Sequence, residues 1–194
     1  MIHHAPVSLQ RMIEAVEAVH QRLMRAVGAL EAGGVPYAVV GGNAVAAWVT
    51  RVDRAAVRNT QDVDILLRRE DLPRASEALE RAGFVPCQVL DVDMFLDGPD
   101  ARPRDAVHIL YAGEKVRSDY GEPSPDVSDS EAGGAFQVVS LDALLKMKLT
   151  ANRDKDRTHV RDLIDVGLVD ATWLDRLPPE LAARLQHLLD TPDG

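Results

Sequence analysis

The sequence predicts an α+β fold, a small mixed β-sheet packed on helices and followed by a C-terminal helical segment. Apolar residues recur at spacings of three and four over residues 9–31, which is typical of one face of a long helix. Short apolar runs at 37–40, 62–67, 84–96 and 106–111 are bounded by glycine, proline or acidic residues, which favours strands. Helical spacing then dominates the C-terminal part of the chain.

Size and composition indicate one globular unit. The chain has 194 residues, 46% of them hydrophobic, and a formal net charge of -9. Single cores are typically built from chains of this length. The longest apolar stretches fall short of a membrane span. We expect a core with an N-terminal helix over 1–139 and, in the same compact unit, a helical segment over 140–194.

The N-terminal part of the chain predicts helix, strand, helix and strand in turn. The long helix stops at Gly33, and the apolar run over 37–40 is predicted to be a buried strand that enters a glycine turn. Asn43 is expected to cap a short helix that ends at Val49. In the strand over 62–67 acids and aliphatics alternate, so the acids share one face.

The middle of the chain predicts one more helix and a second group of strands. A helix is expected over 71–82, with a proline in its first turn. One or two strands are expected over 84–96 and another over 106–111, antiparallel to the preceding one because the connection is short. Residues 112–135 are rich in glycine and acids and predict a long surface loop, followed by an edge strand over 136–139.

The C-terminal segment predicts four helices. Ser140 is expected to cap a helix that runs toward Asn152. A charged stretch leads into a helix from His159 to Gly167, and closing helices are expected over 171–177 and 179–189. His159 itself is interpreted as a solvated helix residue.

Charge and cysteine content limit the location and the partners. A single cysteine, Cys87, fits a reducing compartment, so a cytoplasmic location is expected. The acidic net charge opposes strong nonspecific binding to nucleic acid. Residues 146–161 run against this trend, with six basic and two acidic side chains. A local positive surface is therefore predicted within an acidic protein.

Two short motifs together indicate a site for a metal ion and a phosphate. A strand ends in Gly41-Gly42-Asn43, and about twenty residues later a strand carries Asp62 and Asp64. Alternate strand residues project to one face, so the two carboxylates repel each other unless a cation lies between them. Mg²⁺ takes such oxygen ligands and completes its shell with water and substrate phosphates. A glycine turn before a helix lets backbone N–H groups approach a phosphate.

Each motif also has a plain structural interpretation. Asp62 and Asp64 fit a solvated strand face, and Gly41-Gly42 fits ordinary turn geometry. The order of the motifs along the chain, with strand, turn, helix and second strand, favours the interpretation as a phosphate and metal site.

With that order, the segments Val39–Asn43 and Thr60–Leu66 resemble the signature of the nucleotidyltransferase (polymerase-beta-like) superfamily. The closest similarity is to bacterial minimal nucleotidyltransferases and AbiEii-type proteins, and it covers residues 35–170. The resemblance implies that Asp62 and Asp64 bind Mg²⁺ or Mn²⁺. It also implies that Gly41, Gly42 and Asn43 hold the triphosphate of an NTP substrate, and it supplies the expected order of the strands.

The C-terminal segment matches later parts of the same family. The resemblance implies a nucleotide-binding role for Lys148, Arg153 and Arg161. Lys148 is preferred to Lys146, while a solvated helix face is the plain alternative for either lysine. Arg161 and Asp165 lie four residues apart, so a surface ion pair is the alternative for Arg161.

The sequence departs from the family at the third carboxylate. His108 stands on the strand 106–111 where the family carries the acid that serves as base for the attacking hydroxyl. A neutral imidazole accepts a proton near pH 7 but suits a hard Mg²⁺ ion poorly. Either His108 is the catalytic base of a one-metal site, or the site binds nucleotide without transferring it.

Three functions follow as hypotheses. The first is a metal-dependent nucleotidyltransferase that transfers a nucleoside monophosphate from an NTP to a protein or RNA acceptor. The second is a catalytically degenerate nucleotide-binding or antitoxin-like interaction module, with a protein partner of toxin–antitoxin type. The third is a plain α+β scaffold in which the Asp62 and Asp64 side chains are simply solvated.

Overall fold

The computed structural model describes residues 9–192 and shows a mixed sheet of seven strands in the order β3-β4-β5-β2-β1-β7-β6. The strands are β1 (Ala38–Val40), β2 (Val63–Leu67), β3 (Val85–Val89), β4 (Val92–Leu96), β5 (Ala106–Tyr111), β6 (Ser130–Ala132) and β7 (Gln137–Val139). The α-helices are α1 (Leu9–Ala32), α2 (Gly41–Thr50), α3 (Leu72–Arg81), α4 (Leu141–Ala151), α5 (Asp154–Asp165) and α6 (Pro179–Asp190). The predicted α+β class is confirmed.

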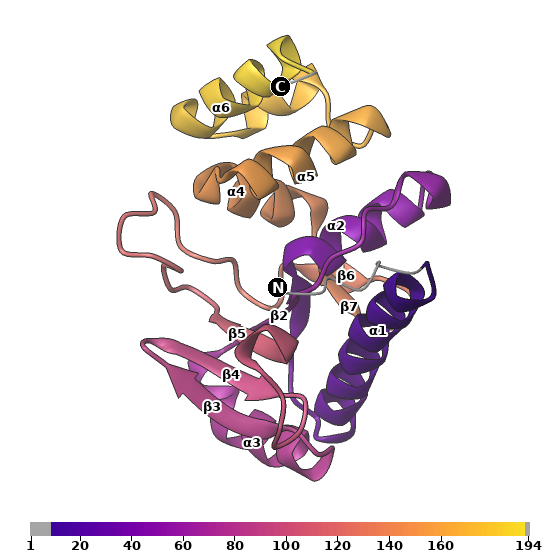
Figure 1. The fold of residues 1–194 in the computed structure, drawn as a ribbon. Helices are drawn as coiled ribbons and strands as arrows, with labels where there is room; N and C mark the ends of the chain where they lie inside the picture. The colour runs from indigo at the N-terminus through magenta and orange to yellow at the C-terminus, as the bar shows by residue number, and fades with distance from the viewer. Residues whose placement is uncertain (1–8, 193–194) are drawn as a thin grey trace, which may run out of the picture.

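Helices cover both faces of the sheet (Figure 1). On one face, α1 and α3 bury a core with β2 side chains such as Ile65 and Leu67, both 0% exposed. On the other face, α2 and the C-terminal helices bury a second core around Leu66. This second core includes Leu144 of α4 and Leu185 of α6. The helices after residue 140 therefore share a core with the sheet.

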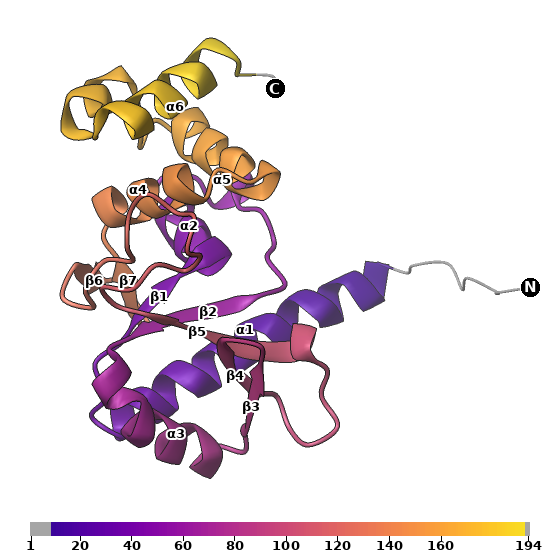
Figure 2. The ribbon, with the colours of Figure 1, turned by 90° about the vertical axis from the view of Figure 1, so that its left-hand side faces the viewer.

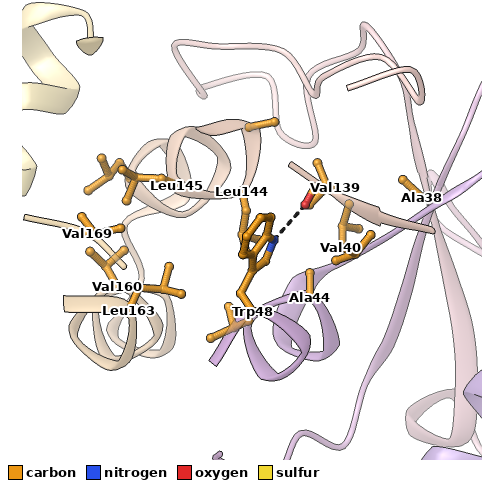
Figure 3. Close-up of a cluster of buried hydrophobic side chains, with 14 of the residues drawn as sticks. Ala38, Val40, Ala44, Trp48, Val139, Leu144, Leu145, Val160, Leu163 and Val169 are labelled. Carbon is orange, nitrogen blue, oxygen red and sulfur yellow. Dashed lines mark hydrogen bonds between the residues drawn. The ribbon is translucent and has the colours of Figure 1, made fainter. Parts of the chain in front are cut away.

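Trp48 of α2 joins three elements in this second core (Figure 3). Its ring lies between Leu144 of α4 and Ala44 of its own helix, and its Nε1 donates a 3.0 Å hydrogen bond to the Val139 carbonyl at the end of β7. A buried indole N–H needs such a partner. The bond therefore fixes how α2, which starts at the glycine turn, sits on the sheet.

The sheet sets neighbouring strands in a register that matters for the site. β1 is antiparallel to β2, with Val40 opposite Asp64. β2 is parallel to β5, with Asp64 opposite His108. β4 is antiparallel to β5, as predicted from the short connection. The last residue of β1, the second acid and the histidine thus form one row across three strands.

Several sequence-based boundaries are wrong. The helix α2 begins at Gly41, and Val40 stands at its N-cap position with no side-chain cap. Asn43 therefore lies inside the helix, where it cannot cap it. The loop predicted over 112–135 contains strand β6, and β7 is not an edge strand because β6 pairs with it. The strand β6 escaped prediction because its three residues, Ser130–Ala132, carry no apolar alternation.

The C-terminal helices also differ in detail. Ser140 caps α4 as predicted, accepting a hydrogen bond from the Ala143 N–H. α5 begins earlier than expected, at Asp154, because the charged stretch is itself helical and has acids in its first turn. The segment Ala171–Arg176 is a 3-10 helix. In the described part of the chain, no helix combines the length and the apolar character needed to cross a membrane.

Leu144→Ala is expected to lower the free energy of unfolding by about 2–5 kcal/mol, since Leu144 is 0% exposed in the second core and truncation leaves a cavity. The matched control is Leu9→Ala, because Leu9 is 72% exposed at the start of α1. Urea unfolding of both variants measures the difference. Equal losses in the two would contradict the packing described above.

Candidate functional site

A cleft of about 1540 Å³ opens beside β2 and β5, and the loop after β5 and helices α4 and α5 complete its walls. Most of the site residues predicted from the sequence line it, although they come from distant parts of the chain. These are Gly41, Gly42, Asp62, Asp64, His108, Lys148 and Arg153. The fold therefore brings the glycine turn, the acids and the cations to one place.

The turn into α2 fits directly against the second acid. Gly41 has φ +68°, a left-handed conformation that favours glycine. A Cβ atom at Gly41 would lie 2.9 Å from Asp64 Cγ and closer still to its Oδ2. A Cβ at Gly42 would lie 2.6 Å from Thr60 Oγ1. Both glycines are needed because the turn approaches these side chains more closely than any other residue could.

The N-terminus of α2 is open toward the cleft. No side chain caps the first turn of this ten-residue helix, so its leading N–H groups lack a side-chain partner. Free N–H groups and the helix dipole together favour an anion at this end. The turn therefore has the chemistry of a phosphate site beside two carboxylates.

Asp62 and Asp64 flank the first residue of β2 and face the cleft. Their side chains are 39% and 24% exposed. Asn43 does not line the cleft; its Nδ2 donates a 2.7 Å hydrogen bond to the Asp62 carbonyl. The contact shown for Asn43 is thus one that positions the Asp62 backbone.

His108 faces Asp64 from the neighbouring strand. Its Nδ1 lies 3.7 Å from Asp64 Oδ1, and both side chains are less than one quarter exposed. The interaction with the Asp64 carboxylate raises the pKa of His108 above its ordinary value against the opposing effect of burial, and the Pro103 backbone adds to the rise. The imidazole is therefore a stronger proton acceptor than free histidine.

A buried ion cluster forms the opposite wall. Asp156 of α5 is 1% exposed and accepts hydrogen bonds from Lys148 Nζ at 3.2 Å and from Arg153 Nε at 2.6 Å. Burial would raise the pKa of Asp156, but Arg153 and Lys148 outweigh it and the pKa is lowered. Burial lowers the pKa of Lys148. Asp156 thus holds two of the predicted nucleotide-binding cations in place.

His159 is not the solvated helix residue that the sequence suggested. It lines the cleft, and its Nδ1 is buried with no hydrogen-bond partner. Burial, helped by the Lys148 charge, lowers the pKa of His159 to about 4. The imidazole is therefore neutral at pH 7.

Other buried polar atoms without partners also gather at the cleft. They are Ser124 Oγ of the loop and Thr150 Oγ1 of α4, and among residues 9–192 the further example, Arg22, lies away from it. Buried polar groups in folded proteins are nearly always satisfied. Their clustering marks surfaces that a ligand or ordered water would satisfy.

Two cations depart from the sequence-based expectation. Arg161 does not line the cleft; its guanidinium donates to the Thr191 carbonyl near the C-terminal end of α6. Lys155, which is not among the predicted site residues, reaches Asp62, with its Nζ 3.4 Å from Asp62 Oδ2. The chain has four lysines, and all of them line the cleft: Lys115, Lys146, Lys148 and Lys155.

The donor set fits a hard divalent cation only in part. Two aspartate side chains supply oxygen donors at the cleft, which suits Mg²⁺ or Mn²⁺. Within residues 9–192 no group of three or more His, Cys, Asp or Glu side chains has metal-binding geometry. A cation held here would therefore take its remaining ligands from water and substrate phosphates, as Mg²⁺ usually does.

This fold is that of the nucleotidyltransferases. The crystal structure of ANT(2'')-Ia in complex with adenylyl-2''-tobramycin matches with a TM-score of 0.52 at 15% identity, over 89% of this chain and 97% of that one. The solution structure of antibiotic-resistance factor ANT(2'')-Ia matches with a TM-score of 0.52 at 13% identity, over 92% of each chain. An antigenic nucleotidyltransferase-like protein from Paracoccidioides brasiliensis gives 0.51 at 15% identity, over 96% and 91%.

The chain belongs to the family described as "Uncharacterised nucleotidyltransferase", whose model matches residues 7–116. That span contains the glycine turn, both acids and His108. No curated protein matches the sequence.

Gly41→Ala is expected to destabilise the fold more than Gly34→Ala, its matched control. Both positions have positive φ, +68° and +62°, so each alanine adds about 1–2 kcal/mol of backbone strain. Nothing lies within 4 Å of a Cβ at Gly34, whereas at Gly41 the new methyl overlaps Asp64, which adds about 1–3 kcal/mol. Urea unfolding measures the difference, and equal losses would mean that the turn does not press on Asp64.

His159 is expected to make stability depend on pH below neutrality. The pKa of His159 is about 4 in the folded protein and near 6.5 when unfolded, so the unfolded chain binds more protons. Falling pH therefore stabilises the unfolded state relative to the folded state. This contribution is absent above pH 6.5 and costs about 1–2 kcal/mol at pH 5. The free energy of unfolding is measured at pH 7 and at pH 5 for the wild type and for His159→Gln. Its fall between the two pH values should be smaller in His159→Gln by that amount. An identical fall in both proteins would refute the assignment.

Proposed function

We propose that the protein transfers a nucleoside monophosphate from an NTP to an acceptor hydroxyl. One observation carries the proposal: the Gly41 turn is in contact with Asp64, so an anion site and a pair of carboxylates share one edge of the cleft. Membership of a nucleotidyltransferase family supports the same reaction class.

In this reaction the acceptor oxygen attacks the α-phosphorus, the bond from that phosphorus to the bridging oxygen breaks, and pyrophosphate leaves. The glycine turn, with Gly41 and Gly42, binds the phosphate tail through backbone N–H groups. Lys148 and Arg153, fixed by Asp156, place positive charge on the opposite wall. Phosphoryl transfer depends mainly on such positioning and charge stabilisation.

Asp62 and Asp64 would hold the divalent cation, Mg²⁺ or Mn²⁺. When bound, it supplies charge stabilisation to the transferring phosphate. The neutral imidazole of His108 is proposed as the catalytic base that takes the proton of the attacking hydroxyl. Its position on β5, with Nδ1 3.7 Å from Asp64 Oδ1, supports this role.

The acceptor is proposed to be a protein or an RNA end. Four cleft lysines keep RNA in the set, whereas the net charge of -9 favours protein or small molecules. One similar structure contains adenylyl-2''-tobramycin, so small hydroxylated acceptors belong in the test.

AbiEii-type similarity, with a protein partner of toxin–antitoxin type, is part of the proposal and rests on the segment from Lys148 to Asp165. We also propose that residues 1–139 form the catalytic core and 140–194 a helical segment within it.

A second function is favoured by one observation. The strand neighbour of Asp64 on β5 is His108 where a third carboxylate would be expected, which would suit a catalytically degenerate nucleotide-binding or antitoxin-like module. Such a protein would bind the nucleotide and release it unchanged.

The deciding experiment measures label transfer. Purified protein is incubated with Mg²⁺ or Mn²⁺ and each α-labelled NTP in turn, with total RNA, a cell lysate and an aminoglycoside as acceptors. Asp62→Asn/Asp64→Asn is expected to lower transfer by on the order of 10³-fold, because loss of the cation site removes several kcal/mol of transition-state stabilisation.

The variant His108→Ala tests the proposed catalytic base. If His108 acts as proposed, transfer falls by about 10²–10⁴-fold while metal-dependent thermal stabilisation by NTP stays as in the wild type. Stabilisation by NTP without transfer in the wild type would favour the binding module. Neither transfer nor stabilisation would leave only a scaffold.

A further inference from the structure

Lys155 makes a contact that the proposed reaction does not explain. Its Nζ lies 3.4 Å from Asp62 Oδ2, so an ammonium of α5 neutralises a carboxylate 93 residues away in the sequence, at the start of β2. Asp62 and Asp64 face the same cleft, and two neighbouring carboxylates repel each other. Lys155 therefore supplies a positive charge to this pair in the protein without ligands.

The other cations beside the acids are held elsewhere. Lys148 is 7% exposed and bound to Asp156, and Arg153 is bound to the same buried carboxylate. Breaking a buried pair leaves an unpaired charge and is strongly unfavourable. Lys148 therefore cannot leave Asp156 at low cost, whereas loss of Arg153, whose side chain is 46% exposed, would leave the buried carboxylate with one partner fewer.

Lys155 differs because its pair is exposed. The side chains of Lys155 and Asp62 are 55% and 39% exposed, and ion pairs of this kind contribute little to stability. Its long flexible stem lets the ammonium move without disturbing α5. Lys155 is therefore a cation on this wall that can change partners, and its present partner is one of the two proposed cation ligands.

A divalent cation held by Asp62 would compete with Lys155 for its carboxylate. At Asp62 a doubly charged ion interacts more strongly with the carboxylate than a single ammonium does. A released ammonium stays in a cleft that the proposed function fills with phosphate, for which lysine is a common point-charge ligand.

We propose that Lys155 is an exchangeable counter-ion: it occupies Asp62 in the absence of a divalent cation and binds the phosphates of the substrate once that cation takes its place. The second half of this inference rests on the proposed function, whereas the first half concerns only Asp62. The exchange keeps the carboxylates partly neutralised in the free protein and adds a phosphate ligand in the loaded one.

The test compares Lys155→Met with Lys146→Met. Lys146 is the matched control because it lines the same cleft and its Nζ is bound to Asp142 at 2.7 Å, so its loss removes the same charge without freeing Asp62. Affinity for Mn²⁺ alone is measured from the free-ion signal in electron paramagnetic resonance. Affinity for inorganic tripolyphosphate in saturating Mn²⁺ is measured by titration calorimetry.

Opposite changes are expected in Lys155→Met. Mn²⁺ alone binds about two- to fivefold tighter, because a competitor is gone. Tripolyphosphate binds about tenfold weaker or worse, because a charged hydrogen-bond donor is gone. In Lys146→Met both affinities stay within about twofold of the wild type. An unchanged melting temperature in Lys155→Met checks that the fold is intact.

Two outcomes would overturn the inference. If Lys155→Met and Lys146→Met tighten Mn²⁺ binding equally, the effect is general charge and not competition at Asp62. If tripolyphosphate affinity is unchanged in Lys155→Met, the ammonium does not move to phosphate. If Lys155→Met shows the two opposite changes but the wild-type protein shows no label transfer, the exchange stands and the transferase function fails. The two failures are therefore distinguishable.

Discussion

The close approach of the Gly41 turn to Asp64 is the constraint on which the site depends. It requires β1 and β2 to pair in one register, with Val40 opposite Asp64, and it requires a left-handed residue with no side chain directly after β1. A shift by one residue would turn Asp64 to the other face of the sheet. The pairing therefore decides both where the helix α2 starts and where the carboxylate faces.

Several features outside the site serve this constraint. Trp48 anchors α2 to the end of β7 through a buried hydrogen bond, and β2 side chains fill cores on both faces of the sheet. Figure 2 shows the helices on either side of that sheet, with α2 and α4 on one side and α1 and α3 on the other. The Asn43 amide holds the Asp62 carbonyl, which fixes the entry into β2. These contacts fix the strands β2 and β5, from which Asp64 and His108 face each other.

The opposite wall is built on a different principle. There a single buried carboxylate, Asp156, holds two cations, and an exposed lysine reaches across to Asp62. One wall is fixed by backbone pairing and the other by charge. This division suits the proposed phosphoryl transfer, which depends mainly on positioning and on stabilising charge.

Local sequence patterns determined several elements of the fold and one side of the candidate site. Spacing of apolar residues gave α1, the glycine and acid motifs gave one side of the cleft, and Ser140 gave the start of α4, because these signals act over a few residues. Tertiary structure alone decided that Arg161 turns to α6 while Lys155 reaches Asp62, and that β6 covers β7. Those outcomes depend on charges and strands brought together from distant parts of the chain, a long-range arrangement that spacing along the sequence cannot encode.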